Sequence, residues 1–322
     1  MKVKARANSN IAIVKYWGKR DEKLRLPTNS SVSITLDKLW TETEVEFDKN
    51  FDKDVIEYID GKFRKKEILR IIEHLERIRN LAKINTKARV VTRNNFEKAA
   101  GMASSASGFA ALSLAGSRAA GLNLSDKELS ILARQGSGSA CRSISGGIVV
   151  WHKGEDNQSS YAEQIKFNDQ WGLRILLVKI KDSKEKKISS TEGMKKALLS
   201  PYFKLAIDEA EKNVKRTVKA LRENDWKVFG EVVEAECFRL HMLTMTSKPP
   251  IIYWKPGTLE VFSQVFEMRK KRVEGFVTVD AGSHVHVICR EKDVEKITMK
   301  LNKIRDVERV LVSGIGKGAR II

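Results

Sequence analysis

Cysteine, proline and long apolar runs are scarce or missing in this sequence. Its 322 residues include three cysteines and five prolines. Cys141, Cys237 and Cys289 are far apart and form no Cys-x-x-Cys pair, so they make no metal site, and one of the three stays without a disulfide partner in the chain. The sequence has no apolar run of about 18 residues, which excludes a membrane-spanning helix. The first residues carry no apolar signal core, and we expect a cytoplasmic protein.

Acidic residues are too few to balance the basic ones, and the net charge is +19. Such an excess favours anionic partners, among which nucleic acid has to be considered. Acidic residues nevertheless interrupt the basic runs, and the sequence lacks zinc-finger, basic-zipper and aromatic RNA-binding patterns. We therefore interpret the charge as a solvated surface and expect no nucleic-acid partner. Abundant Lys, Arg and Glu with few prolines also fit a heat-adapted, thermophile-like protein.

Small residues crowd one octet, Gly101-Met102-Ala103-Ser104-Ser105-Ala106-Ser107-Gly108. They allow a backbone to approach a ligand closely. The helical pattern that follows places the octet at a helix start, where amide groups and the helix dipole favour an anion. The octet is therefore a candidate phosphate-binding loop. The alternative is an ordinary capped helix that a glycine turn precedes.

A second stretch of small residues, Gly136–Gly147, surrounds Arg142 with serines. Alone it could be a flexible linker, but predicted elements flank it on both sides. A guanidinium among hydroxyl groups can bind a carboxylate or a phosphate with two hydrogen bonds. Arg142 is therefore a candidate anion-binding residue.

Charged residues also follow two predicted strands. Lys15 and Lys19 come after an apolar run and are candidates to bind anionic oxygens, with a strand end bearing surface cations as the alternative. Asp280 follows another strand and precedes Ala281-Gly282, a suitable place for a positioned carboxylate, with an Asx turn as the alternative. His284 and His286 share a strand face nearby, but no third ligand is evident, so we expect no metal site there.

Periodicity predicts the secondary structure. We expect strands at 2–14, 32–36, 41–47, 86–93, 148–151, 173–178, 275–279, 285–288 and 310–312. We expect helices at 65–81, from the octet to about 121, and at 126–134, 190–199, 202–222, 225–244 and 257–272. Asp60-Gly61 is predicted to be a hairpin turn. The length suits two domains, and a change in composition over 166–190 places them at 1–182 and 183–322.

Five segments together resemble the GHMP kinase superfamily and, within it, the mevalonate diphosphate decarboxylases. They are Asn10–Asp21, Leu26–Ser33, Ala99–Gly108, Gly136–Ser143 and Val279–Gly282. Each match is short, but five in the right order over residues 10–282 are highly specific.

The resemblance implies an α+β fold of two domains. The first would be a ribosomal-protein-like α/β domain that binds ATP, and the second a helix-rich α+β domain, with a last strand that can return to the first. It also implies decarboxylation of 5-diphosphomevalonate to isopentenyl diphosphate in isoprenoid biosynthesis. This reaction uses ATP and Mg²⁺, phosphorylates the 3-hydroxyl, and releases ADP, phosphate and carbon dioxide. Such enzymes are commonly homodimers.

The same resemblance implies roles for the candidate residues. Asp280 would orient and deprotonate the 3-hydroxyl, Lys15 would neutralise the transferred phosphoryl group, and Arg142 would hold the substrate carboxylate. The octet would bind ATP, with the hydroxyls of its three serines on the phosphates and Ser105 beside Mg²⁺. The remaining substrate contacts would come from Tyr16, Lys19, Ser137, Ser139, Ser190, Thr191 and Met194.

Three positions depart from the family's usual pattern. Ser283-His284 stands where Pro-Asn is common, Lys248 where Phe is usual, and Thr191 where some members carry an arginine near the diphosphate. The last departure leaves a mevalonate 5-phosphate decarboxylase, or a mevalonate 3-kinase-like enzyme of the same fold, as the alternative. The retained Asp280 argues against the 3-kinase, because that activity is linked to loss of this aspartate.

Overall fold

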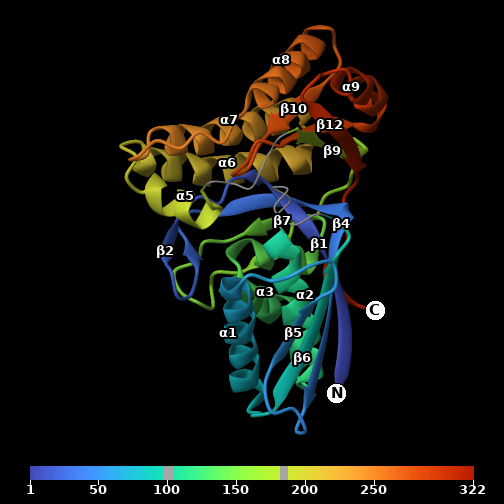
Figure 1. Ribbon diagram of the computed structural model, residues 1–322. Coiled ribbons are helices and arrows are strands. Elements are labelled where there is room, and N and C mark those ends of the chain that lie inside the picture. Colours follow the sequence, from blue (N-terminus) through green and yellow to red (C-terminus); the bar gives the residue numbers. More distant parts are fainter. Residues whose placement is uncertain (97–103, 182–187) are drawn as a thin grey trace.

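Two β-sheets organise the chain (Figure 1). The computed structural model describes residues 1–96, 104–181 and 188–322. The first sheet runs in the order β13 (Arg320–Ile321), β1 (Lys2–Val14), β4 (Ser31–Asp48), β6 (Lys87–Asn94) and β5 (Val55–Tyr58), while β7 (Ile148–Trp151) pairs with β4 and β8 (Ala162–Gln164) pairs with β7. The second runs β10 (Gly275–Thr278), β11 (Val285–Arg290), β9 (Leu173–Ile180) and β12 (Val307–Ser313). A two-stranded ribbon joins β2 (Lys19–Asp21) to β3 (Leu26–Pro27).

Three helices cover one face of the first sheet: α1 (Lys65–Ala82), α2 (Ser104–Ala119) and α3 (Asp126–Gly136). Their apolar faces explain this packing, since Ile71, Leu75 and Ile78 of α1 are buried against α2 and the strands. A capping box starts α3, because the Ser125 hydroxyl accepts the Glu128 amide and the Glu128 side chain accepts the Ser125 amide. A 3₁₀ turn, η1 (Gly138–Cys141), and the short α4 (Arg142–Ser145) follow.

The second half is helix-rich, as predicted. It contains α5 (Ser190–Ala197), α6 (Phe203–Glu223), α7 (Trp226–Met245), α8 (Pro256–Lys270), the 3₁₀ turn η2 (Glu291–Asp293) and α9 (Val294–Leu301). An apolar cluster joins the two halves, since Ile13 and Ile34 of the first sheet share it with Phe229 of α7 and Leu177 of β9. Within the described ranges, none of the helices has the length and apolar content that a membrane crossing requires.

Two local predictions are wrong. The segments 32–36 and 41–47 belong to one strand, β4, because β1 pairs with it continuously apart from irregularities in register. Exposed Asp37 and Lys38 interrupt the alternation without ending the strand. Asp60-Gly61 is not a hairpin turn, because β5 pairs with β6 in parallel and α1 carries the chain between them.

The predicted domain boundary at 182/183 lies outside the described residues, which resume at 188. The preceding strand, β9, is an inner strand of the second sheet, between β11 and β12. At the other end of the chain, β13 pairs with β1 of the first sheet. We propose that the first domain ends between β8 and β9 and that the last strand belongs to it.

Burial determines the chemical state of the cysteines. Cys141, Cys237 and Cys289 are all buried and free of disulfides. Burial raises the pKa of each thiol to about 12, so the three remain protonated and unreactive near neutral pH.

The glycine-rich tail after β12 crosses back to the first domain and contacts the segment that carries Arg142. The Gly147 amide donates to Gly316 O at 3.0 Å, and the Ala319 amide donates to Ile144 O at 2.9 Å. A Cβ at Gly318 would lie closer to the carbonyl oxygen of Ile144 than van der Waals contact permits. Glycine is therefore needed at this crossing because backbone meets backbone.

We expect Gly318→Ala to lower the free energy of unfolding by about 2 kcal/mol, since the added methyl group must push one of two backbones aside. Urea denaturation measures the change. Gly314→Ala is the matched control, because the nearest atom to its Cβ is a side-chain oxygen of Asp37 at 3.3 Å. Equal losses in the two variants would contradict this account of the crossing.

Candidate active site

A cavity of about 290 Å³ lies where the two domains meet. Its walls come from the end of β1, the start of α2, η1, α4, α5 and the loop after β10. Residues as distant in the sequence as Lys15 and Asp280, which are 265 positions apart, thus line one space. They include eleven of the predicted site residues: Lys15, Tyr16, Lys19, Ser105, Ser137, Ser139, Arg142, Ser190, Thr191, Met194 and Asp280.

Lys15 and Asp280 form an ion pair in this cavity. The Lys15 ammonium is buried and donates to Asp280 Oδ1 and to Ala12 O, each at 2.7 Å. The Asp280 side chain is 29% exposed, so the carboxylate pairs with a buried cation and still faces the cavity. A fixed carboxylate with an adjacent fixed positive charge suits the activation of a hydroxyl group that attacks a phosphate.

Arg142 lines the same cavity, and hydrogen bonds to neighbouring side chains hold its guanidinium in place. Its Nη1 donates to Ser31 Oγ at 2.8 Å, and its Nε lies 3.4 Å from Asn10 Oδ1. The guanidinium also lies 5.7 Å from the ring centre of Trp151. Burial lowers the pKa of Arg142, while the nearby Asp280 opposes this shift. These contacts orient a guanidinium that a substrate carboxylate can meet.

Tyr16 and Lys19 form another wall. The Tyr16 hydroxyl is buried and has no hydrogen-bond partner within the described chain. Burial raises the pKa of Tyr16, so the hydroxyl remains a donor, and a ligand oxygen would satisfy it. Lys19 Nζ pairs with Glu22 at 2.8 Å, and burial lowers the pKa of Lys19. A Cβ at Gly138 would lie within 3.0 Å of the Tyr16 ring, which explains glycine at that position.

The predicted phosphate-binding loop is described from Ser104, where α2 begins. Gly101, Met102 and Ala103 lie outside the described residues. The Ser105 hydroxyl is exposed and accepts a hydrogen bond from Ser137 Oγ at 3.2 Å. We expected the Ser107 hydroxyl to bind the ATP phosphates. It is instead buried and bonds to Thr41 Oγ1 at 2.7 Å. Helical periodicity turns Ala106 and Ser107 toward the strands.

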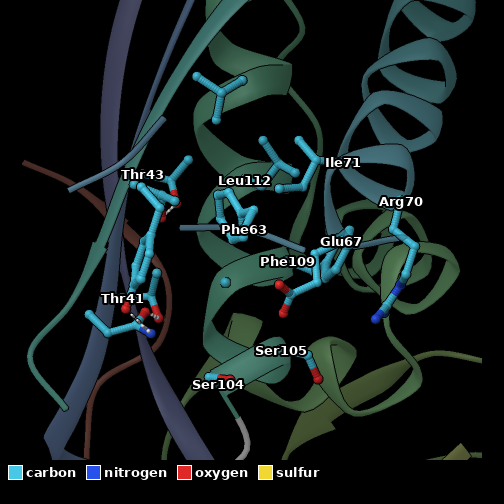
Figure 2. Close-up of a pocket in the computed structure, with 15 residues that line it drawn as sticks. Thr41, Thr43, Phe63, Glu67, Arg70, Ile71, Ser104, Ser105, Phe109 and Leu112 are labelled. Carbon is cyan, nitrogen blue, oxygen red and sulfur yellow. Dashed lines mark hydrogen bonds between the residues drawn. The ribbon is translucent and has the colours of Figure 1, made fainter. Parts of the chain in front are cut away.

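A second pocket adjoins the start of α2 (Figure 2). Thr41 and Thr43 lie on its strand side, whereas Phe63, Ile71, Phe109 and Leu112 supply apolar walls. Ser105 and Arg70 line both pockets, so the two spaces meet at the start of α2. Apolar walls with a few polar groups suit a nucleoside.

Sequence reasoning missed Arg25 and Arg70. Both line the cavity between the domains, and Arg70 extends from α1 beside Phe109 (Figure 2). Arg70 Nη2 donates to Gly136 O at 2.9 Å, while its buried Nε has no partner within the described ranges. Burial lowers the pKa of Arg70 to about 10. The charged face of an amphipathic helix normally meets solvent, so no local signal distinguishes Arg70 from its neighbours.

The part of the chain that the structure describes has no group of three or more His, Cys, Asp and Glu residues able to hold a metal ion. His284 instead has a structural contact, because its Nδ1 accepts the Ile180 amide at 3.0 Å. The serine hydroxyls and the Asp280 carboxylate are hard oxygen donors, which suit a Mg²⁺ ion that phosphate groups also hold.

The fold and site together define a class of protein. An α+β chain with a basic cavity between two domains, beside a largely apolar pocket at a helix start, has the architecture of a GHMP-type phosphotransferase. Family models sharpen this assignment. Residues 7–162 match the diphosphomevalonate decarboxylase-like N-terminal domain, and residues 176–319 match the mevalonate 5-diphosphate decarboxylase C-terminal domain. The chain belongs to the diphosphomevalonate decarboxylase family.

Individual relatives are similar to this chain over nearly their full length. The diphosphomevalonate decarboxylase of Candida albicans is 34% identical, with 96% of this chain and 94% of the relative aligned. The mevalonate diphosphate decarboxylase of Staphylococcus aureus is 36% identical with a TM-score of 0.95, covering 100% of this chain and 98% of the other. The structure of MDDEF in complex with MVAPP, AMPPCP and magnesium is 39% identical with a TM-score of 0.94, covering 100% and 99%.

Proposed function

We propose that this protein decarboxylates (R)-5-diphosphomevalonate with ATP, producing isopentenyl diphosphate, ADP, phosphate and carbon dioxide. The observation that carries the proposal is the Lys15–Asp280 ion pair beside Arg142, in a cavity that shares Ser105 and Arg70 with the pocket at the start of α2. The relatives that share this fold over the whole chain carry the same activity in their names.

The cavity residues divide the chemistry between them. Asp280 accepts the proton of the 3-hydroxyl as that oxygen attacks the γ-phosphate of ATP. Lys15, held 2.7 Å from Asp280, keeps the carboxylate in place and offsets the charge on the transferred group. A tertiary alcohol is a poor nucleophile, so positioning and charge neutralisation contribute most of the rate enhancement. Arg142 holds the carboxylate until the 3-phosphate leaves and the carbon–carbon bond to carbon dioxide breaks.

The 5-diphosphate is assigned to the basic end of the same cavity. Tyr16 and Lys19 supply a hydroxyl and an ammonium, and Ser190, Thr191 and Met194 of α5 line the same cavity. Ser137 and Ser139 also line the cavity. Arg25 and Arg70 add two positive charges that sequence reasoning did not include. These charges supply anion binding even though Thr191 replaces an arginine that some members carry.

ATP is assigned to the pocket at the start of α2. Its nucleoside lies among Phe63, Ile71, Phe109 and Leu112, and its phosphates reach Ser104 and Ser105 at the helix N-terminus. The Ser105 hydroxyl would hold Mg²⁺ together with the phosphates, and the ion would reduce the negative charge on them. MDDEF, which is in complex with AMPPCP and magnesium, supports the use of ATP and Mg²⁺.

Gly108→Leu tests the nucleotide assignment. Nothing lies within 4 Å of a Cβ at Gly108, and this position lines the nucleoside pocket, so a leucine side chain would project into the pocket. We expect the KM for ATP to rise at least about 10-fold, because one buried contact is worth about 1–3 kcal/mol in such a pocket. The KM for 5-diphosphomevalonate is the internal control and should stay unchanged. A higher KM for both substrates would argue against a nucleotide pocket here.

A direct assay tests the function itself. Mevalonate, mevalonate 5-phosphate and mevalonate 5-diphosphate are each incubated with ATP and Mg²⁺, and phosphate and carbon dioxide are measured. We expect equal amounts of phosphate and carbon dioxide from the diphosphate alone. Turnover of the monophosphate would instead identify a 5-phosphate decarboxylase, and ADP without carbon dioxide from mevalonate would identify a 3-kinase.

We further propose that the protein works in the cytoplasm as a homodimer and that it is heat-adapted. Its family resemblance supports the dimer, its water-soluble anionic substrates support the location, and its many Lys, Arg and Glu residues support heat adaptation. Sedimentation equilibrium tests the homodimer by measuring the mass of the assembly. Thermal denaturation tests heat adaptation by measuring the midpoint temperature of unfolding.

A further inference from the structure

The peptide group of Lys15 is held by a helix from the other domain. Glu236 Oε2, on α7, accepts the Lys15 amide at 2.9 Å. Arg239 Nη2, one turn later on α7, donates to the Lys15 carbonyl at 3.1 Å, and Asn29 donates to the same carbonyl at 2.9 Å. Neither Glu236 nor Arg239 lines the cavity, so neither is a candidate to touch a substrate.

The two α7 side chains form a rigid pair. Arg239 Nε donates to Glu236 Oε1 at 2.8 Å, and Arg239 Nη2 donates to Glu236 Oε2 at 2.6 Å. Asn213 of α6 donates to Glu236 Oε1 at 2.9 Å. Glu236 is fully buried and Arg239 is 7% exposed. A buried ion pair is costly to desolvate and contributes little to net stability, so its retention calls for an explanation other than stability.

The same helix also contacts the backbone next to Asp280. His241 Nε2 lies 3.4 Å from the carbonyl oxygen of Val279, and burial lowers the pKa of His241 to about 3, which keeps the imidazole neutral. Lys15 follows a strand of the first sheet, whereas Asp280 follows a strand of the second. Helix α7 therefore bonds to the chain on both sides of the ion pair that joins the domains.

We propose that Glu236 and Arg239 are positioning residues, which set the place of the Lys15 ammonium relative to Asp280. This inference rests on the proposed function. Arg239 is suited to the task because its planar fork contacts Glu236 and the Lys15 carbonyl at once, which the single ammonium of a lysine does not reproduce. A shift of Lys15 by 1 Å is enough to slow a reaction that depends on alignment.

Arg239→Lys is the direct test, because the substituted residue keeps the positive charge opposite Glu236 and loses the fork. We expect kcat to fall between about 10-fold and 100-fold while the KM values for ATP and 5-diphosphomevalonate change less than 2-fold. Arg79→Lys is the matched control. Arg79 is also a buried helical arginine; it pairs with Asp54 and donates to Thr86 O at 2.8 Å, far from the cavity. A similar fall in kcat for both variants, or an unchanged kcat for Arg239→Lys, would overturn the proposal.

A second variant and a second measurement distinguish a loss of positioning from a loss of folding. The double variant Glu236→Gln/Arg239→Gln removes both buried charges together, so no unpaired charge remains. We expect its thermal midpoint to exceed that of Glu236→Gln alone and its kcat to stay low. A kcat restored to the wild-type value would overturn the proposal.

Hydrogen exchange of the peptide that contains Lys15, measured by mass spectrometry, requires no substrate. We expect faster exchange in Arg239→Lys than in the wild type. Equal exchange would contradict the proposal that Glu236 and Arg239 hold the peptide group of Lys15. If the wild type fails to decarboxylate 5-diphosphomevalonate, the proposed function is wrong, and the exchange result still tests the contact between α7 and Lys15.

Discussion

Asp280→Asn should lower kcat by at least about 10³-fold, because the amide neither accepts the 3-hydroxyl proton nor keeps the charge that holds the Lys15 ammonium. The substitution preserves the size of the side chain, so the loss comes from chemistry and not from packing. Initial rates of phosphate and carbon dioxide release, both measured with saturating ATP, provide kcat. The two rates should fall by the same factor, because carbon dioxide leaves only after the phosphoryl group has been transferred.

Binding measurements separate this role from a structural one. Asp280→Asn leaves a buried ammonium without its counter-charge, which costs stability, so assays belong well below the thermal midpoint. Affinity for AMPPCP should stay near the wild-type value, because Asp280 does not line the nucleoside pocket. Near-normal turnover, or a loss of turnover that follows a loss of AMPPCP binding, would refute Asp280 as the proton acceptor.

Sequence periodicity predicted the helices well, because the buried face of a helix produces a regular spacing of apolar residues within the helix itself. The spacing of Ile71, Leu75 and Ile78 identifies α1 to within a residue, and the capping box locates the start of α3. The partner of a strand produces no such local pattern. The alternation of β5 is the same whether β6 runs parallel or antiparallel to it, so the predicted hairpin at Asp60-Gly61 was wrong. Exposed Asp37 and Lys38 likewise look like a strand end, although β1 holds β4 together across them.

The candidate site was predictable where its residues lie in short motifs. Lys15, Arg142 and Asp280 each follow or interrupt a distinctive segment, and the structure brings all three to one cavity. Ser107 was misjudged because composition does not state which face of a helix a hydroxyl occupies; its bond to Thr41 depends on a strand 66 residues away. Arg70, Glu236 and Arg239 were missed because charged residues on helices usually meet solvent, and only tertiary packing reveals the exceptions.

Arg142→Gln is expected to lower kcat/KM for 5-diphosphomevalonate by about 10²- to 10³-fold, which corresponds to roughly 3–4 kcal/mol and to the loss of a charge-assisted, bidentate contact. Ser31 and Asn10 hold the guanidinium from behind, so a glutamine at this position can still occupy the space but cannot meet a carboxylate with two donors and a positive charge. Both parameters should change, since the same group holds the carboxylate during binding and during bond cleavage. Steady-state kinetics with 5-diphosphomevalonate varied at saturating ATP separates kcat from KM.

Arg134→Gln is the matched control for this experiment. Arg134 is fully buried, donates to Ser160 O at 2.8 Å, and does not line the cavity. It should lose stability comparable to that of the Arg142 variant while its kcat/KM stays near the wild-type value. Binding of AMPPCP without the second substrate should be equal in both variants, because neither arginine lines the nucleoside pocket. If Arg142→Gln loses AMPPCP binding and keeps its affinity for 5-diphosphomevalonate, the guanidinium serves the nucleotide, and its assignment to the substrate carboxylate is wrong.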